Sequence, residues 1–177
     1  MAEAAPEKPN ELTHELLSRG LCVSPSGKVL LCRIKAAAHR SFLPGGHIDP
    51  GEGARRALER EIAEELALGC RAGRFLGAAE HFFGAKGSET FEMNVVFALE
   101  IPALRGEGGE EKAPRSAEPW QEFFWCDPER LTEAGFEPAS LRPVVPGWVR
   151  AVRGGGTGRE TPDFASTYEN MEPRQVR

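Results

Sequence analysis

The stretch Gly46–Gly69, GHIDPGEGARRALEREIAEELALG, decides the fold. Its first eight residues include three glycines and one proline, a composition that suits neither a helix nor a strand interior and predicts a loop. From Ala54 to about Leu68 every residue is a good or fair helix former, and Leu58, Ile62 and Leu66 repeat at a spacing of four. We therefore predict a loop that leads into an amphipathic helix, and the last glycine of the stretch is well placed to end it.

Three glutamates of this helix, Glu61, Glu64 and Glu65, border its apolar face. With about 100° per residue, Glu65 lies about 20° from Leu58, Glu61 about 60° and Glu64 about 120°, all on the same side. Like charges this close repel one another. A bound hard cation offsets the repulsion, because Mg²⁺ takes carboxylate oxygens and bridges to substrate phosphates. The alternative is an ordinary solvated acidic face.

The spacing of these charged residues resembles the signature of the Nudix hydrolase family. The family's box reads Gly, five residues, Glu, seven residues, then Arg-Glu-apolar-x-Glu-Glu-x-Gly-apolar. This chain has Gly46, Glu52 and Arg60-Glu61-Ile62-x-Glu64-Glu65 at those places. It departs at Ala67, where the box has glycine, and the next glycine is Gly69. We expect the helix to run an extra half-turn as a result.

The resemblance implies an α/β (α+β) fold, the Nudix-type α/β/α sandwich with a mixed β-sheet between helices. The local patterns add strands on both sides of the box. Two apolar runs around a Ser-Pro-Ser-Gly turn favour an antiparallel hairpin, a second hairpin follows the helix, and a later apolar run is followed by an Asp-Pro helix start. These segments are 20–23 with 28–33, 75–83 with 90–99, 120–126 and 127–131, and a short helix is expected near 140–145.

The length of 177 residues fits one domain with tails. We predict a flexible N-terminus over 1–11, the Nudix hydrolase domain over 12–150 and a disordered C-terminal tail over 151–177, because the tail has too few apolar residues to order itself. Within the domain, the stretch 105–119 combines glycine, proline and charge without periodicity. It is expected to be a mobile loop.

The resemblance also assigns roles to the box residues. It implies that Glu61, Glu64 and Glu65 bind Mg²⁺ or Mn²⁺, with the backbone carbonyl of Gly45 as a further ligand. Arg60 and Glu52 would orient these ligands, and Gly46 supports the motif as its first glycine. The family's reaction is a metal-assisted displacement at phosphorus by an activated water.

The general base and the substrate contacts lie outside the box. Glu122, at the start of a predicted strand after the mobile loop, is our candidate for the catalytic base, with Glu118 and Glu64 as alternatives. Phe82, Phe83 and Trp120 are candidates for stacking on a nucleobase. Both sets have a plainer interpretation, as surface acids and core aromatics. His47 and His81 are left outside the site as packing residues.

The composition of the chain argues against two classes of partner, duplex DNA and membranes. With 27 acidic and 22 basic residues the net charge is −5, which argues against binding of duplex DNA. No apolar run approaches the roughly 20 residues of a membrane helix, and the polar residues 1–10 are unlike a secretory signal, so we expect a cytoplasmic protein. The four separated cysteines are interpreted as small core residues in a reducing compartment. They are Cys22, Cys32, Cys70 and Cys126.

We therefore predict a pyrophosphohydrolase that cuts a phosphoanhydride bond in a nucleoside diphosphate linked to another moiety. Its expected partner is a small nucleotide-type molecule, and the resemblance allows a homodimer, since many relatives are dimers. Two alternatives remain. One is a Nudix-fold sensor that binds a nucleotide ligand without cleaving it, and the other is an interaction module whose acidic helix is incidental.

Overall fold

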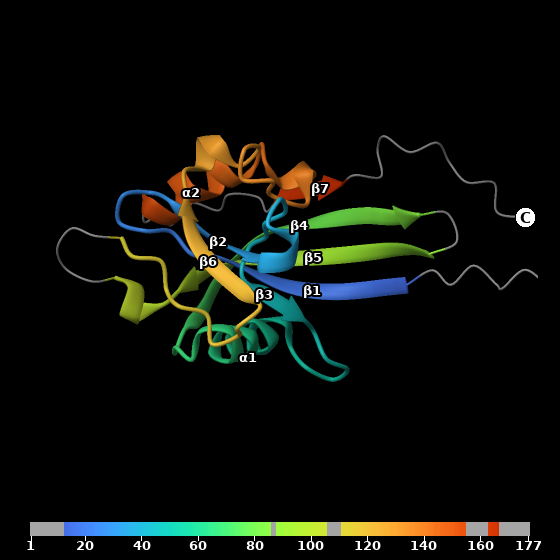
Figure 1. Cartoon of the computed structure of the whole chain (residues 1–177), viewed down its shortest axis with the longest axis horizontal. Helices are drawn as coiled ribbons and strands as arrows, with labels where there is room; N and C mark the ends of the chain where they lie inside the picture. Colours follow the sequence, from blue (N-terminus) through green and yellow to red (C-terminus); the bar gives the residue numbers. More distant parts are fainter. Residues whose placement is uncertain (1–12, 86–87, 106–110, 155–162, 167–177) are drawn as a thin grey trace, which may run out of the picture.

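A five-stranded mixed sheet runs through the computed structural model, which describes residues 13–85, 88–105, 111–154 and 163–166 (Figure 1). The strand order is β3-β1-β5-β4-β7. β1 is parallel to β5 and antiparallel to β3, while β4 is antiparallel to β5 and parallel to β7. The strands are β1 Thr13–Leu21, β3 Gly45–His47, β4 Arg71–Ala85, β5 Ser88–Glu100 and β7 Asp163–Ser166.

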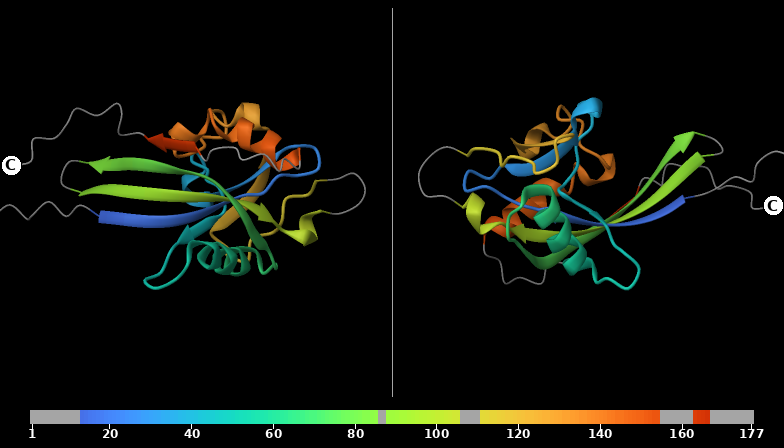
Figure 2. Two further views of the ribbon diagram at one scale, coloured as in Figure 1. Left: turned by 180° about the vertical axis from the view of Figure 1, so that it is seen from behind. Right: turned by 60° about the horizontal axis from the view of Figure 1, so that its bottom comes forward.

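One helix covers each face of this sheet. The apolar stripe of α1 (Ala54–Leu66) is buried against Phe97 and Leu99 of β5. Helix α2 (Val145–Arg153) buries Trp148 and Val149 in a second core with Val96, on the other face of the same strand. The predicted α/β/α sandwich with a mixed sheet between helices is confirmed. The long strands β1, β4 and β5 project beyond both helices (Figure 2).

A separate two-stranded ribbon pairs β2 (Val29–Ile34) with β6 (Gln121–Cys126) in antiparallel register. The predicted antiparallel hairpin is confirmed only close to its turn, where Val23 bridges Val29 and the N–H of Leu30 donates to the carbonyl of Cys22 at 3.0 Å. Beyond that point β1 and β2 do not pair. Both edges of β1 are already taken, by β3 and β5. The turn at 24–27 instead leads the chain away from the sheet to meet β6.

The later elements agree better with the sequence. β4 and β5 form the predicted second hairpin, and β6 (Gln121–Cys126) lies where a strand was expected over 120–126. Asp127 accepts a hydrogen bond from the backbone of Glu129 at the start of the 3₁₀ turn η3 (Pro128–Arg130), which is the predicted capped start. The other 3₁₀ turns of the described residues are η1 (Lys35–Ala37), η2 (Pro102–Leu104) and η4 (Ala139–Leu141).

The C-terminal boundary differs from the prediction. The short helix expected near 140–145 is the turn η4, and α2 follows it as far as Arg153 because its apolar residues are buried. Residues 163–166 form β7 against β4. Residues 151–153 and 163–166 of the tail thus belong to α2 and β7, and disorder of the rest stays a prediction. Residues 1–12, most of the remaining tail and part of the predicted 105–119 loop lie outside the described residues.

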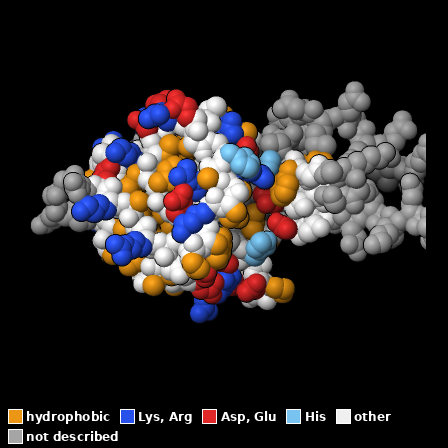
Figure 3. All heavy atoms as spheres, in the orientation of Figure 1, with side chains coloured by type: hydrophobic (Ala, Val, Ile, Leu, Met, Phe, Trp, Pro, Cys, Tyr) orange, Lys and Arg blue, Asp and Glu red, His pale blue; other side chains and the backbone are white. Residues whose placement is uncertain are grey.

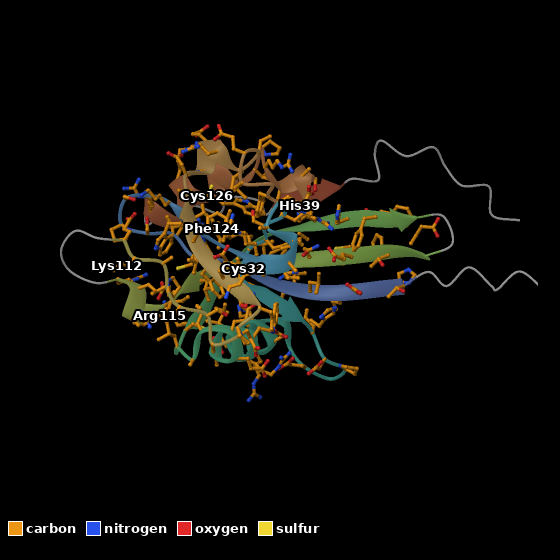
Figure 4. All side chains as sticks on the ribbon, in the orientation of Figure 1. Cys32, His39, Lys112, Arg115, Phe124 and Cys126 are labelled. Carbon is orange, nitrogen blue, oxygen red and sulfur yellow. The ribbon has the colours of Figure 1, made fainter. Side chains whose placement is uncertain are left out.

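The four cysteines are free, as expected for core residues, and Cys22, Cys32 and Cys126 are buried. Cys32 and Cys126 lie on the β2–β6 ribbon (Figure 4). Burial raises the pKa of Cys22 and of Cys32 to about 12. These thiols are therefore protonated and unreactive at neutral pH.

Helix α1 ends two residues earlier than predicted. It stops at Leu66, and Ala67 adopts the left-handed conformation with φ of 53°, its N–H bonding to the carbonyl of Ala63. Ala67 thus takes the conformation that a glycine usually supplies at a helix end. The expected extra half-turn was wrong, because Ala67 itself adopts the left-handed conformation and ends the helix.

Replacing Ala67 with glycine is expected to stabilise the protein by about 0.5–1 kcal/mol, since glycine adopts the left-handed region without a Cβ penalty. The measurement is urea unfolding monitored by circular dichroism. Ala63→Gly, at an exposed position inside the same helix, is the matched control and should destabilise by about 1 kcal/mol. A loss of stability in Ala67→Gly would contradict this account of the helix end.

Glu111 fastens the segment before β6 to the turn after β1. Its carboxylate accepts hydrogen bonds from the backbone N–H and hydroxyl of Ser26, at 2.8 and 2.7 Å, and lies 3.5 Å from the ammonium of Lys28. The hydrogen bonds from Ser26 lower the pKa of Glu111 from 4.5 to about 2. The ionised form is therefore favoured in the folded state.

A lowered carboxyl pKa gives stability that is present above pH 4.5 and disappears as the pH falls toward 2. We expect Glu111→Gln to be less stable than the wild type at pH 7. The difference in free energy of unfolding should shrink between pH 4.5 and pH 2, as measured by urea titrations across that range. A difference that stays constant with pH would contradict this role of Glu111.

Candidate active site

Gly45 joins the box helix to the sheet. Its N–H donates to the carboxylate of Glu65 at 3.2 Å, and its carbonyl accepts a hydrogen bond from Arg19. Its φ is +119°, and a Cβ here would lie 2.2 Å from the backbone oxygen of Ser18. Only glycine fits at this position, because both the conformation and the contact exclude a side chain.

Gly46 makes room for a carboxylate. A Cβ at this position would lie 2.4 Å from Cδ and one oxygen of Glu61. The Glu61 side chain therefore rests directly on the backbone of β3. A glycine at the first box position thus leaves room for the Glu61 carboxylate, which lies next to the residue that follows Gly45.

Arg60 connects the carboxylates of the box. Its Nε and Nη2 donate to both oxygens of Glu52, at 3.1 and 2.9 Å, and its Nη1 donates to Glu61 at 2.9 Å and to Glu64 at 3.3 Å. Nη2 also donates to the carbonyl of His47 at 3.0 Å. Hydrogen bonding from Arg60 lowers the pKa of Glu52. The structure thus brings together Glu52, Arg60, Glu61 and Glu64, as the spacing predicted.

Glu65 is the buried member of the set, with 8% of its surface exposed. The amide of Gln121 donates to its carboxylate at 2.7 Å, in addition to the N–H of Gly45. Burial raises the pKa of Glu65, the hydrogen bond from Gln121 opposes that shift, and the nearby charge of Glu61 adds to it. Sequence reasoning missed Gln121, although a polar residue at an inward position of β6 was a signal.

The donor set suits a hard cation. No three His, Cys, Asp or Glu side chains of the described residues already converge as a metal group. Glu61 and Glu64 nevertheless both accept a hydrogen bond from one guanidinium nitrogen of Arg60, so the two carboxylates face the same cationic group. All the donors are oxygens, the ligands that Mg²⁺ prefers. The residues fit the ion that the box implies.

A family model described as the NUDIX domain matches residues 17–147, most of the chain. The chain belongs to the Nudix hydrolase family. A curated relative is the CTP pyrophosphohydrolase of Escherichia coli (strain K12), 25% identical over 122 residues, which are 67% of this chain and 81% of the relative.

Solved Nudix structures share the fold. The MutT protein of Methanosarcina mazei Go1 has a TM-score of 0.55 at 18% identity, over 81% of this chain and 97% of that protein. An Ap4A hydrolase of C. elegans has a TM-score of 0.54 at 18% identity, over 79% of this chain and 98% of the other. At such identities the likeness shows the fold alone.

The candidate base Glu122 does not join the Nudix box. Successive side chains of a strand point to opposite faces, so Glu122 points away from Gln121 and Glu65. It pairs instead with Arg33 of β2 at 2.6 Å. Glu118 lies nearer to α1, because the N–H of Ala117 donates to the carbonyl of Glu65 at 2.7 Å.

The three candidate aromatic contacts do not lie together on one face of the molecule. Phe82 and Phe83 are neighbours on β4 and face opposite sides of the sheet. Phe82 lies opposite Phe91 on the face that α1 covers further along, whereas Phe83 lies on the face of the α2 core. Trp120 is 49% exposed, and its indole donates to Glu118 at 3.0 Å.

Phe83 belongs to a polar and aromatic surface that sequence reasoning largely missed. The Arg40 guanidinium lies between two rings, 5.6 Å from the centroid of Phe42 and 5.8 Å from that of Phe83, and His81 stacks on Phe83 at 5.1 Å. Among the described residues, neither buried ring nitrogen of His81 has a hydrogen-bond partner, and burial lowers the pKa of His81. Histidine and acidic side chains gather where the long strands leave the body of the Nudix domain (Figure 3).

Proposed function

We propose that this chain is a metal-dependent pyrophosphohydrolase that cuts the phosphoanhydride bond of a nucleoside diphosphate linked to another moiety. The observation that carries the proposal is the bridge from Arg60 to Glu61 and Glu64, beside the buried Glu65. A bound Mg²⁺ or Mn²⁺ supplies charge neutralisation at the pyrophosphate and acidifies a water molecule. Glu61, Glu64, Glu65 and the carbonyl of Gly45 are the residues that would hold it.

The chain's own groups would prepare this site. Arg60 and Glu52 fix the direction of the box carboxylates through charge-assisted hydrogen bonds. Gln121 and the N–H of Gly45 keep the buried Glu65 in place. Each held carboxylate loses less conformational freedom when a cation binds, which favours a preorganised site.

Among the candidate bases, the position of Glu64 suits the task best. Its side chain is 57% exposed, so its carboxylate can accept a proton from a water molecule at the surface of the site. Glu118 is a second candidate because its backbone neighbour is anchored to the end of α1. For Glu122 to act, its carboxylate would have to leave Arg33 and reach around the β2–β6 ribbon.

The aromatic surface supports a nucleoside as part of the substrate. A planar guanidinium already lies between Phe42 and Phe83, and a planar base can stack on either ring from the same region. Of the predicted contacts, Phe83 is retained in this proposal. Trp120 is kept as a secondary candidate because it is exposed, and Phe82 faces the other side of the sheet.

A substrate panel tests this function. It contains ADP-ribose, nucleotide sugars, CTP and other nucleoside triphosphates, and dinucleoside polyphosphates, each with Mg²⁺, with Mn²⁺ and with EDTA. CTP is included because a relative is named as a CTP pyrophosphohydrolase. We expect metal-dependent cleavage of at least one member. Complete inactivity of the folded protein, with a melting temperature unchanged by metal plus nucleotide, would contradict the proposal.

Two further predictions stay open beside this one. A homodimer and a cytoplasmic location were expected from the family resemblance and the polar N-terminus. Among the described residues, no helix is long and apolar enough to cross a membrane.

A further inference from the structure

Arg19 of β1 lies between the box and the aromatic surface. Its Nη1 donates to the carbonyl of Leu43 at 3.3 Å and to that of Gly45, and its Nε donates to the side chain of Asn94 at 3.4 Å. Gly45 therefore holds Glu65 through its N–H and Arg19 through its carbonyl. Replacing Arg19 would therefore remove a hydrogen bond from the residue that holds the buried carboxylate of Glu65.

The bonds to Arg19 leave part of its guanidinium free. A guanidinium has five N–H donors, and these three hydrogen bonds use Nε and Nη1. Within the described ranges, Nη2 makes no hydrogen bond, so its two N–H groups are available. Asn94, buried at 2% exposure, fixes the edge of the guanidinium that carries Nε and so determines where Nη2 points.

Arg19 also adjoins the proposed nucleoside site. Its Cζ lies 5.8 Å from the centroid of Phe42, the ring that Arg40 also covers. A molecule with its base beside Phe42 or Phe83 and its reacting bond beside Glu61 must span the region of Arg19. The group that connects a base to the reacting bond in such substrates is ribose and phosphate.

We infer that Arg19 binds a phosphate oxygen of the substrate through Nη2, and that Asn94 positions it. This inference rests on the proposed function. A planar guanidinium matches the geometry of phosphate oxygens, and its charge is permanent. Arg19 thereby has two roles: Nη1 donates to the carbonyl of Gly45, and Nη2 donates to a phosphate oxygen of the substrate.

Inorganic pyrophosphate is the probe, used as a competitive inhibitor of the best panel substrate in Mg²⁺ buffer. We expect Arg19→Gln to raise both the inhibition constant of pyrophosphate and the KM by about tenfold or more, the loss of a charge-assisted contact. Arg19→Lys keeps the charge and should show a smaller rise. Asn94→Ala should raise KM with little change in kcat. The control is Arg130→Gln, which removes an exposed arginine paired with Glu133 and should change neither constant.

Circular dichroism and melting temperatures accompany each variant, and Arg19→Lys provides the test if Arg19→Gln does not fold. If the Arg19 variants fold and are active but the inhibition constant of pyrophosphate is unchanged, the phosphate-binding role of Arg19 is wrong. A purely structural Arg19 would give that result, with lower melting temperatures and lower kcat. The proposed hydrolase function would still stand. If the wild type neither cleaves the panel nor binds pyrophosphate, the proposed function fails with it.

Discussion

Glu64→Gln is expected to leave the fold intact and to lower kcat on the order of 10²–10³-fold, in the range seen when one charge-stabilising group is removed from an active site. The substitution keeps the size of the side chain and removes one negative charge. Glu64 is 57% exposed and its carboxylate pairs with Arg60 at 3.3 Å, so little of the folding energy depends on it.

Steady-state kinetics and thermal melting of the two proteins test this expectation. Glu133→Gln is the matched control, because Glu133 is an exposed glutamate with an arginine partner at 2.7 Å on a different part of the surface. It should keep full activity. Wild-type kcat in a folded Glu64→Gln protein would remove Glu64 from the site and weaken the assignment of the other box glutamates.

Gly46→Ala is expected to lower activity by about 10²-fold while changing the free energy of unfolding little. The new methyl group would lie 2.4 Å from the carboxylate of Glu61, the far end of a flexible side chain. That carboxylate can move away at small cost in stability. Its displacement by about an ångström is costly in activity, because catalysis depends on the placement of the reacting groups.

Gly53→Ala is the control for the same loop, because a Cβ there meets nothing within 4 Å. We expect nearly full activity from that variant and only a small change in stability at the helix N-cap. The measurements are kcat/KM and urea unfolding for both variants. A fully active Gly46→Ala enzyme would show that Glu61 does not need its observed position.

The box helix was predictable because its evidence is local. The helix-forming composition, the apolar repeat and the spacing of Glu52, Arg60 and the three glutamates all lie within about 20 residues, and neighbouring turns of one helix bring them together. The same holds for the β4–β5 hairpin, in which sequence neighbours pair. These features need no knowledge of the rest of the chain.

The features that were missed depend on distant parts of the chain. β2 pairs with β6 across almost ninety residues, and an apolar run does not reveal its partner. The hydrogen bond from Gln121 to Glu65 and that from Arg19 to Gly45 depend on the same long-range topology. Glu122 points away from the box because a one-residue step along a strand reverses the face, and its role as the catalytic base stays a prediction.

The most direct test of the central claim is the rate and product pattern of wild-type hydrolysis as Mg²⁺ is raised from zero, in EDTA, to several millimolar. With the best panel substrate, the account predicts no turnover in EDTA, a rate that rises and saturates with Mg²⁺, and products that are the two phosphate-containing halves of the cleaved anhydride. Turnover that persists in EDTA, or products from cleavage of another kind of bond, would contradict it.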